Sequence, residues 1–359
     1  MLDVQNDELP FITGRSKDDF KGALLQNGDI IIADTAEDET TGKVCEIVNI
    51  QDKDVVAGLH TMVCRPKNKT AEGYFGYYMN SSSYHHQLLP LMQGIKVLSL
   101  SKTNVQKTTV KYPKDKAEQQ KIADCLRRID TLITLHQRKY EKLVNIKKSM
   151  LNKMFPPNGA SVPEIRFKGF TDPWEQRKIS ELAEKTYGGG TPTTSNEAFW
   201  NGNIPWIQSS DIVDGKLMGV EPRKYITQTG LNNSATQLVP KDSIAIITRV
   251  GVGKLAYMPF SYSTSQDFLS LSKLNTEPFF TVYACYKKLQ SELNTVQGTS
   301  IKGITKDELL AKTISVPVYS EQKQIGSFFT QLDTLITLHQ RKLEKLQNIK
   351  KSCLEKMFV

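Results

Sequence analysis

Apolar residues recur at alternating steps of four and three along two separate stretches of the chain, Glu118–Phe155 and Glu321–Phe358. Both stretches are rich in Leu, Lys, Gln and Glu, which favour helices, and they contain no Pro and only one Gly, Gly326. An average spacing of 3.5 residues held over ten positions is typical of a coiled-coil seam. The pattern predicts two helices of 38 residues, each about 57 Å long.

The two predicted helices are copies of each other. Aligned without a gap they share 25 of 38 residues, including "DTLITLHQRK" at Asp130–Lys139 and Asp333–Lys342. The chain is therefore a tandem duplication, and two helices with matching seams most simply pair with each other. Pseudo-twofold symmetry favours an antiparallel pair. The predicted helix-pairing seam consists of Ile122, Leu126, Ile129, Ile133, His136, Tyr140 and Leu143 in the first helix and Ile325, Phe329, Leu332, Ile336, His339, Leu343 and Leu346 in the second.

The two histidines of the seam would meet near the symmetry axis of an antiparallel pair. A polar layer that fixes the register of the helices is one interpretation of His136 and His339, and metal binding is the other. We assign no metal site.

The regions that precede the helices show the shorter periods of strands. Residues 243–259 predict two strands around a glycine turn, residues 313–319 predict another strand, and residues 278–294 have the period of a helix. The earlier region follows the same plan, because "LLQNGDIIIADT" matches "LVPKDSIAIITR". These patterns predict an α+β protein in which two mixed α/β regions alternate with two long antiparallel coiled-coil helices.

The two mixed regions differ in length. Residues 156–320 make 165 residues, whereas 117 residues precede Glu118, a difference of 48. The earlier region has no counterpart of Pro163–Ile207. We therefore expect the first region to begin part-way through its module and to expose a sheet edge and apolar surface.

Composition places most of the charge on the repeats. The formal net charge is +9, and the repeats hold nine Lys and Arg against four acids and seven against four, so they account for eight of it. A polyanion close to the helices explains this charge, and a solvated helix face is the alternative.

The sequence has no apolar run long enough for a membrane span and no apolar signal core at its start, which predicts a cytoplasmic protein without membrane contact. Five cysteines without a CxxC spacing argue against disulfides and zinc and predict reduced core residues.

Motifs of catalysis are imitated but not completed. "GVGKL" at Gly251–Leu255 resembles a phosphate loop, yet Thr248 and Leu255 stand where that loop needs Gly and Ser or Thr. "YGGGTP" lacks the strand, helix and paired acid of a dinucleotide fold, and "FPPN" inverts the order of the adenine methyltransferase tetrapeptide. We recognise no coupled His, Ser and Asp set and no nuclease carboxylate cluster. The sequence predicts a non-catalytic protein without a cofactor.

A series of motifs resembles a known family. "GGGTPTT" at Gly188–Thr194 is followed by "FWNGNIPWI", "SSDI" and "VPVYSEQKQI", and the second of the duplicated helices ends in "LEKMF". Their order along the whole chain resembles the specificity subunit of type I restriction-modification systems. The resemblance implies two target recognition domains, each reading one half of a bipartite site on double-stranded DNA. It also implies two methyltransferase subunits and, bound through them, two restriction subunits.

This resemblance gives names to the predicted regions. Residues 1–117 would be a first target recognition domain that is incomplete at its amino end, and residues 118–155 a central conserved spacer helix. Residues 156–320 would be the second target recognition domain, and residues 321–359 the carboxy-terminal spacer helix. A coiled-coil adaptor without DNA binding and a stand-alone nuclease are the alternative functions.

Candidate DNA contacts come from polar loops and from cations near them. Loop side chains read base edges, and Lys and Arg position phosphates. Residues Gly188–Ser195 suggest a small flexible loop, residues that follow Trp206 suggest a second reading loop, and a glycine turn suggests a hairpin that enters a groove. An ordinary turn and a strand end packed on the core are the alternatives. The candidates are Thr191, Thr193, Thr194, Ser195, Gln208, Ser209, Ser210, Arg249, Lys254 and Lys302, with Lys43 and Lys96 in the first region.

Overall fold

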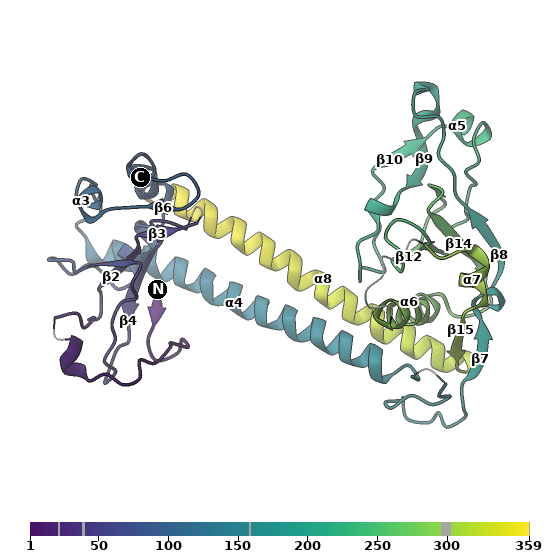
Figure 1. Ribbon diagram of the computed structural model, residues 1–359, viewed down its shortest axis with the longest axis horizontal. Helices are drawn as coiled ribbons and strands as arrows, with labels where there is room; N and C mark the ends of the chain where they lie inside the picture. The colour runs from purple at the N-terminus through teal and green to yellow at the C-terminus, as the bar shows by residue number, and fades with distance from the viewer. Residues whose placement is uncertain (21, 38–39, 158, 296–302, 359) are drawn as a thin grey trace. The chain divides into compact units, whose positions relative to one another are not determined.

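The protein divides into two compact units, and each unit contains part of both long helices. The computed structural model describes residues 1–20, 22–37, 40–157, 159–295 and 303–358 (Figure 1). Unit 1 comprises residues 1–139 and 339–359, and unit 2 comprises residues 140–338. The helices α4 (Lys116–Lys153) and α8 (Tyr319–Lys356) each run from one unit into the other.

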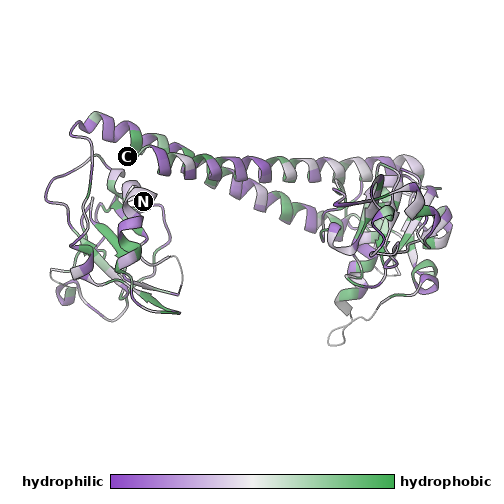
Figure 2. Ribbon diagram, turned by 90° about the horizontal axis from the view of Figure 1, so that it is seen from above, coloured by the Kyte–Doolittle hydropathy of each residue, from purple (hydrophilic) through white to green (hydrophobic). Residues whose placement is uncertain are grey.

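The two long helices confirm the helices predicted from the seam, with both boundaries shifted by two residues. Asp115 precedes α4 and accepts a hydrogen bond of 2.8 Å from the Ala117 N–H, as a helix start requires. Pro156 follows α4 and Pro317 precedes α8, since proline cannot continue a helix interior. Hydrophilic and hydrophobic residues alternate along both helices (Figure 2), as expected for helices with one packed face.

Contacts inside each unit show that α4 and α8 are antiparallel. In unit 1, Lys350 near the end of α8 pairs with Asp130 in the first half of α4, at 2.6 Å. In unit 2, Lys147 near the end of α4 pairs with Asp333 in the first half of α8, also at 2.6 Å. Every predicted seam residue is buried or half-buried.

Unit 2 is built around a four-stranded sheet of order β12-β11-β14-β8, which α6 covers. A three-stranded sheet of order β10-β9-β13 and the pair β15-β7 complete the unit. The two strands around the glycine turn, the later strand and the helix predicted from the sequence are β11, β12, β15 and α6. The elements are β7 (Glu175–Lys178), η3 (Ile179–Glu181), β8 (Ala183–Gly188), η4 (Glu197–Phe199), β9 (Trp200–Ile207), η5 (Ser209–Asp211), β10 (Lys224–Ile226), α5 (Gln228–Asn232), β11 (Ser243–Ile247), β12 (Leu255–Met258), β13 (Ser263–Thr264), β14 (Phe268–Leu274), α6 (Pro278–Thr295), α7 (Lys306–Ala311) and β15 (Thr313–Val316).

Unit 1 is smaller and has a sheet of order β1-β4-β2-β5, with β3 and β6 forming a separate pair. Its central strand β2 pairs antiparallel with β4 and β5, just as β11 pairs with β12 and β14 in unit 2. The elements are β1 (Leu2–Asp3), η1 (Lys17–Phe20), β2 (Ile30–Ala33), β3 (Thr35–Ala36), β4 (Val44–Val48), β5 (Thr61–Cys64), α1 (Tyr74–Tyr78), α2 (Ser82–Leu88), η2 (Leu89–Leu91), β6 (Leu98–Ser99) and α3 (Lys102–Val105). The α+β class and the repeated plan are confirmed.

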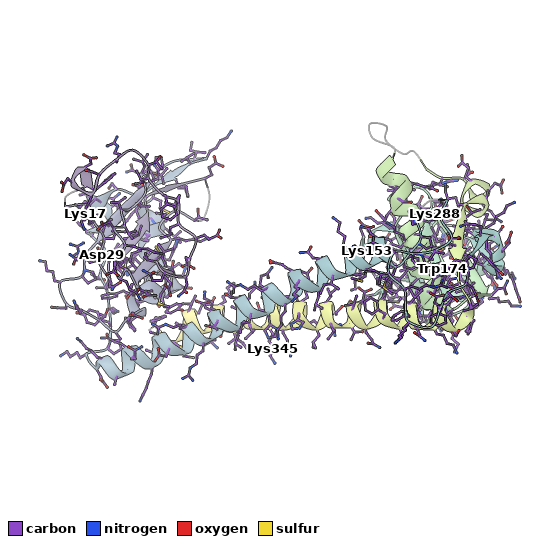
Figure 3. All side chains as sticks on the ribbon, turned by 90° about the horizontal axis from the view of Figure 1, so that it is seen from below. Lys17, Asp29, Lys153, Trp174, Lys288 and Lys345 are labelled. Carbon is purple, nitrogen blue, oxygen red and sulfur yellow. The ribbon has the colours of Figure 1, made fainter. Side chains whose placement is uncertain are left out.

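The last phenylalanine of each repeat enters the core of the unit where its helix ends. In unit 2, Phe155 packs between Phe280 and Phe329, at ring-centroid distances of 5.7 and 5.8 Å, and against the edge of Trp174 at 6.1 Å. Figure 3 labels Trp174 among the side chains of unit 2. In unit 1, Phe358 is likewise buried and packs against the rings of Tyr74 and Tyr78 in α1. Both helix ends are therefore anchored by burial of a large apolar side chain.

Candidate nucleic-acid interface

The two units present the same hairpin. In unit 2 the turn between β11 and β12 is closed by the Gly253 N–H, which donates to the Ile247 carbonyl. In unit 1 the Gly42 N–H donates to the Ala33 carbonyl at 2.8 Å. The lysine that follows each glycine, Lys254 or Lys43, therefore occupies the same position. Lys43 is exposed and Lys254 is half-buried.

Candidate residues of unit 2 meet where two parallel strands end. The strands β9 and β13 are parallel, and the Ser265 N–H donates to the Ile207 carbonyl at 2.9 Å, so Gln208 and Gln266 leave the sheet at the same edge. Thr191 donates its hydroxyl to Gln266 Oε1 at 2.6 Å, and both residues are exposed. Thr191 and Gln208 are therefore brought to one edge, together with Gln266, which the sequence did not single out.

Arg249 belongs to the same region of the surface. The Thr248 N–H donates to the Asp267 carbonyl at 2.7 Å, which ties the β11–β12 turn to the residue after Gln266. Arg249 follows Thr248 and is exposed. A polar pair and a cation thus lie on adjoining loops, an arrangement suited to bases and phosphates. Lys302 lies outside the described residues.

Two of the three glycines in the predicted reading loop, Gly189 and Gly190, are packed against neighbouring backbone, whereas a side chain at Gly188 would meet nothing within 4 Å. The expectation of a flexible loop is therefore wrong for Gly189 and Gly190. A side chain at Gly189 would meet the Ser265 carbonyl oxygen at 1.8 Å, and one at Gly190 would meet the Thr236 nitrogen at 2.5 Å. These glycines allow two backbones to approach closely. The residues beyond them, Thr193, Thr194 and Ser195, are exposed.

Two tryptophans hold that exposed loop. The ring nitrogen of Trp206 donates to the Gly190 carbonyl at 3.0 Å, and that of Trp200 donates to the Thr193 carbonyl at 3.2 Å. Lys224 places its ammonium 5.8 Å from the centroid of each indole ring. Trp206 is buried in the core, whereas Trp200 is half-buried.

A buried carboxylate fixes the second predicted loop. Gln208 begins a turn in which its backbone N–H donates to Asp211 Oδ2 at 3.0 Å, with Ser209 half-buried and Ser210 exposed. The other oxygen of Asp211 accepts no hydrogen bond among the described residues and lies 3.5 Å from the Arg223 guanidinium. Arg223 is exposed and was missed from the sequence, because it lies twelve positions after Asp211 and no motif links the two residues.

The remaining candidate cation of unit 1 has no such setting. Lys96 is exposed in a bend between η2 and β6, and its neighbours Ile95 and Val97 are exposed as well. No described residue forms a salt bridge with Lys96. The structure therefore brings together the candidates of unit 2 more closely than those of unit 1.

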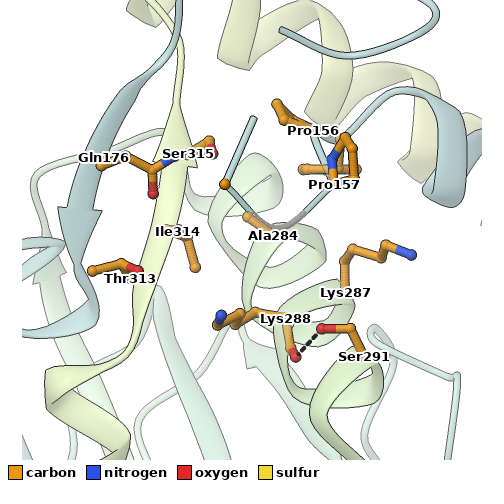
Figure 4. A pocket seen from close by; sticks show the side chains of 12 residues that line it. Pro156, Pro157, Gln176, Ala284, Lys287, Lys288, Ser291, Thr313, Ile314 and Ser315 are labelled. Atoms are coloured by element: carbon orange, nitrogen blue, oxygen red, sulfur yellow. Dashed lines mark hydrogen bonds between the residues drawn. The ribbon is translucent and has the colours of Figure 1, made fainter. Parts of the chain in front are cut away.

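A pocket in unit 2 lies apart from these loops. It has a volume of about 350 Å³ at the end of α4, and none of the candidate DNA contacts lines it. In Figure 4, Pro157 and Lys287 lie on one side of it, and Gln176 and Ser315 on the other. Burial lowers the pKa of the Lys287 ammonium.

Cysteines and metal ligands give no second site in the part of the chain that the structure describes. All five cysteines are free, and burial raises the pKa of the Cys285 thiol to about 12. Cys125 is exposed, so the expectation of core cysteines is wrong for this residue. No cluster of three metal-ligating side chains occurs among the described residues. Likewise, none of the described helices is long and apolar enough to cross a membrane.

Comparison with known proteins gives the same family throughout. The family model described as "Type I restriction modification DNA specificity domain" matches residues 3–145 and 171–348. A putative type I restriction enzyme MjaX specificity subunit of Methanocaldococcus jannaschii is 22% identical over 355 residues, covering 96% of this chain and 80% of that protein. The Escherichia coli EcoR124I/EcoR124II specificity subunit is 30% identical over 169 residues, covering 45% of this chain and 41% of the relative.

Solved structures share the fold. The S subunit of a type I restriction-modification system from M. genitalium has a TM-score of 0.63 at 15% identity, covering 93% of this chain and 83% of that chain. A chain from a structure that concerns complex assembly and conformational transition of the type I R-M system has a TM-score of 0.55 at 19% identity, covering 93% and 82%. At these identities the likeness concerns the fold alone.

Proposed function

The chain belongs to the family of type I restriction modification DNA specificity domains, and we propose from this premise that it reads a bipartite site on double-stranded DNA. Each unit would supply one target recognition domain, with approximate limits of residues 1–117 and 156–320. The spacer helices 118–155 and 321–359 would set the distance between the half-sites. The protein would give specificity to its partners and carry no catalytic group itself.

One observation carries this proposal more than any other. In unit 2, Thr191, Gln266 and Arg249 come from three loops that hydrogen bonds join at one edge, and all three are exposed. Hydrogen-bonding side chains beside a cation are what direct readout and phosphate positioning require. The same hairpin in unit 1 repeats the lysine at Lys43, which favours one reading site in each unit.

The helices supply the argument for partners. Two leucines in the first repeat, Leu132 and Leu135, are exposed, and the equivalent leucines of the second repeat, Leu335 and Leu338, are exposed as well. Identical apolar residues kept on the surface in both copies favour two equal docking sites. We assign them to two methyltransferase subunits, through which two restriction subunits would bind.

An exchange experiment tests the division of labour. Replacing residues 161–320 with the equivalent region of a relative should change one half-site and leave the other half-site and the spacer unchanged. Methylated motifs would be mapped in cells that carry each form together with the partner subunits. A simultaneous change in both half-sites would contradict the proposal. A chain that binds no duplex at any salt concentration would instead favour the adaptor, and metal-dependent cleavage by the purified chain would favour the nuclease.

A second experiment tests the helices as a ruler. Four residues inserted next to His136 and four inserted next to His339 add about one turn, or about 6 Å, to the stretch of each long helix between the Lys350–Asp130 and Lys147–Asp333 contacts. The preferred spacer should grow by one or two base pairs, because successive base pairs lie about 3.4 Å apart. The half-site sequences should stay the same. An unchanged spacer with full activity would show that the helices do not set the distance.

A further inference from the structure

In unit 2 a single segment, residues 161–188, covers two strand edges, and no described residue of unit 1 covers the equivalent edges. In unit 2, β7 pairs with β15, β8 pairs with β14, and η3 joins β7 to β8. In unit 1 the strand equivalent to β14 is β5, because each takes the same place beside β2 or β11. The strand β5 forms an edge of its sheet. Residues 108–112 correspond to β15 and form no strand.

The correspondence of residues 108–112 with β15 rests on the helix that follows. In unit 2, Gln322 of α8 donates to the Pro317 carbonyl at 2.8 Å, directly after β15. In unit 1 the equivalent residue of α4, Gln119, donates to the Pro113 carbonyl at 2.6 Å. Counting back from the two prolines aligns Val110 with Ile314.

In residues 108–112, the backbone groups without a partner are those that would face a neighbouring strand equivalent to β7. In unit 2 the Ile179 N–H donates to the Lys312 carbonyl, and antiparallel alternation then turns the backbone groups of Ile314 and Val316 toward β7. Their counterparts Val110 and Tyr112 have backbone N–H and C=O groups that meet no partner among the described residues. Such groups are a template for strand addition.

Residues on the other side of this segment are already bonded. The Thr109 N–H donates to Gln87 Oε1 and its carbonyl accepts from Gln87 Nε2, both at 3.0 Å. The Lys111 N–H donates to the Tyr78 hydroxyl at 2.9 Å. These hydrogen bonds hold one side of the segment, whereas the backbone groups of Val110 and Tyr112 on its other side have no partner among the described residues.

Apolar side chains confirm which cover is absent. Ile314 and Val316 are 6% and 3% exposed, whereas Val110 and Tyr112 are 44% and 40% exposed. Val63 on β5 is also 40% exposed. A partner strand would therefore bury apolar area together with the free backbone groups.

The carboxylate at the start of α4 indicates that a segment bound to unit 1 should carry a positive charge. Glu321 at the start of α8 has no exposed side-chain surface and receives two hydrogen bonds, of 2.7 and 2.8 Å, from the guanidinium of Arg166. The equivalent residue of α4 is Glu118, which is exposed and forms no salt bridge with any described residue. Arg166 precedes β7 and lies with β7 and β8 in the single segment 161–188 of unit 2.

We propose that unit 1 binds an extended segment of a second polypeptide at its open edge, by which we mean β5, residues 108–112 and Glu118. The segment would supply two strands to the free edges and an arginine to Glu118, as residues 161–188 do in unit 2. A second copy of this chain cannot donate its own residues 161–188 without exposing Glu321 in its unit 2. The surface goes beyond the proposed DNA reading, because its ligand is a polypeptide.

A labelled peptide of residues 161–188 tests the proposal on the intact chain. We expect saturable binding that Glu118→Gln weakens at least about tenfold, since a charged hydrogen-bonded pair is lost. Arg166→Gln in the peptide should weaken binding by a similar factor, and combining the two changes should add little. Glu118→Arg in the chain with Arg166→Glu in the peptide should recover binding. Glu355→Gln, another exposed acid of unit 1, is the matched control and should have no effect.

Three outcomes would overturn the proposal. One is absence of binding, and another is binding that Glu118→Gln leaves unchanged, which would place the peptide elsewhere, including unit 2. The third is concentration-dependent dimerisation of the chain alone that Tyr112→Lys abolishes, which would make a second copy the occupant. Because the readout is peptide binding, none of these outcomes bears on DNA specificity.

Discussion

In both units the same triad of polar side chains, a Tyr, an Asp and a Lys, connects the sheet-containing module, meaning the part of the unit outside α4 and α8, to the long helices. In unit 1 the Tyr77 hydroxyl donates to Asp130 Oδ2 at 2.9 Å, while Lys350 contacts the other oxygen. In unit 2 the Tyr283 hydroxyl donates to Asp333 Oδ2 at 2.6 Å, while Lys147 contacts the other oxygen. Each triad links a helix of the module, α1 or α6, to both long helices. The contact between module and long helices is therefore what the duplication has kept.

A second shared contact orients the module helix. The Ala71 N–H, just before α1, donates to Gln119 Oε1 at 2.9 Å, and the Glu277 N–H, just before α6, donates to Gln322 Oε1 at 2.8 Å. These glutamines occupy equivalent positions of α4 and α8, and both are buried. The cover of the strand edges differs between units 1 and 2, whereas the contacts that join each module to the long helices are the same. The comparison teaches that the frame which orients a module does not depend on residues 161–188.

The largest losses of stability should come from substitutions of the aromatic anchors. Phe155→Ala should lower the free energy of unfolding by about 4 kcal/mol and Phe358→Ala by about 3 kcal/mol, because Phe155 also packs against Trp174. Urea denaturation measures both values. Equal costs would mean that Trp174 adds nothing to the anchor of unit 2.

Substitutions at the starts of the long helices should cost no more than loss of an anchor, but their costs should differ more between the two units. Arg166→Ala should cost about 3 kcal/mol, because it leaves Glu321 buried without a partner. Glu118→Gln should change stability by no more than about 0.5 kcal/mol, since Glu118 is exposed. The same denaturation experiment checks both, and a large cost at Glu118 would contradict the openness of unit 1.

Replacing the Asp of each triad should lower the free energy of unfolding by different amounts in the two units. Asp333→Asn should cost about 2 kcal/mol and Asp130→Asn about 1 kcal/mol, because the Lys147–Asp333 pair is less exposed than the Lys350–Asp130 pair. Amide exchange in α6 and α1 should rise accordingly. A reversed order would show that burial does not govern these joints.

The smallest expected effect concerns the histidines where the repeats meet. Their Nδ1 atoms lie 2.8 Å apart, and burial, His136, Lys139 and Lys342 lower the pKa of His339 from its ordinary value of 6.5. The unfolded chain then binds more protons than the folded chain, so stability should fall as the pH drops below about 6.5. Replacing both histidines with Leu should flatten this dependence. A melting temperature with the same pH profile in both proteins would refute it.

Sequence periodicity was sufficient for the regular parts of the fold. The long helices and their seam followed from apolar spacing, and their antiparallel direction followed from the pseudo-twofold symmetry of the duplication. The elements β11, β12 and α6 followed from local periodicity and the glycine turn. Residues 108–112 show where a sequence match fails, because they align with β15 yet form no strand. A strand needs a partner, and its partner in unit 2 comes from a distant segment.

The candidate site could be predicted only in part for a similar reason. Thr191 and Arg249 were identified by residue type beside glycines, which marks loops. Gln266 and Arg223 become visible only when hydrogen bonds join loops that lie far apart in the sequence. The packed glycines, Gly189 and Gly190, were misread because close backbone approach and flexibility favour the same residue.

Amide hydrogen exchange of the intact chain tests the central comparison most directly. Equivalent backbone positions should differ, with slow exchange at Ile314 and Val316, which lie in a paired strand, and fast exchange at Val110 and Tyr112, which lie at the open edge. The hydrogen bonds that both units share provide the internal control. The amides of α1, which follows the Ala71–Gln119 bond, and those of α6, which follows the Glu277–Gln322 bond, should all be protected. Equal protection at Val110 and Ile314 would contradict the account, because it would show that unit 1 is already closed.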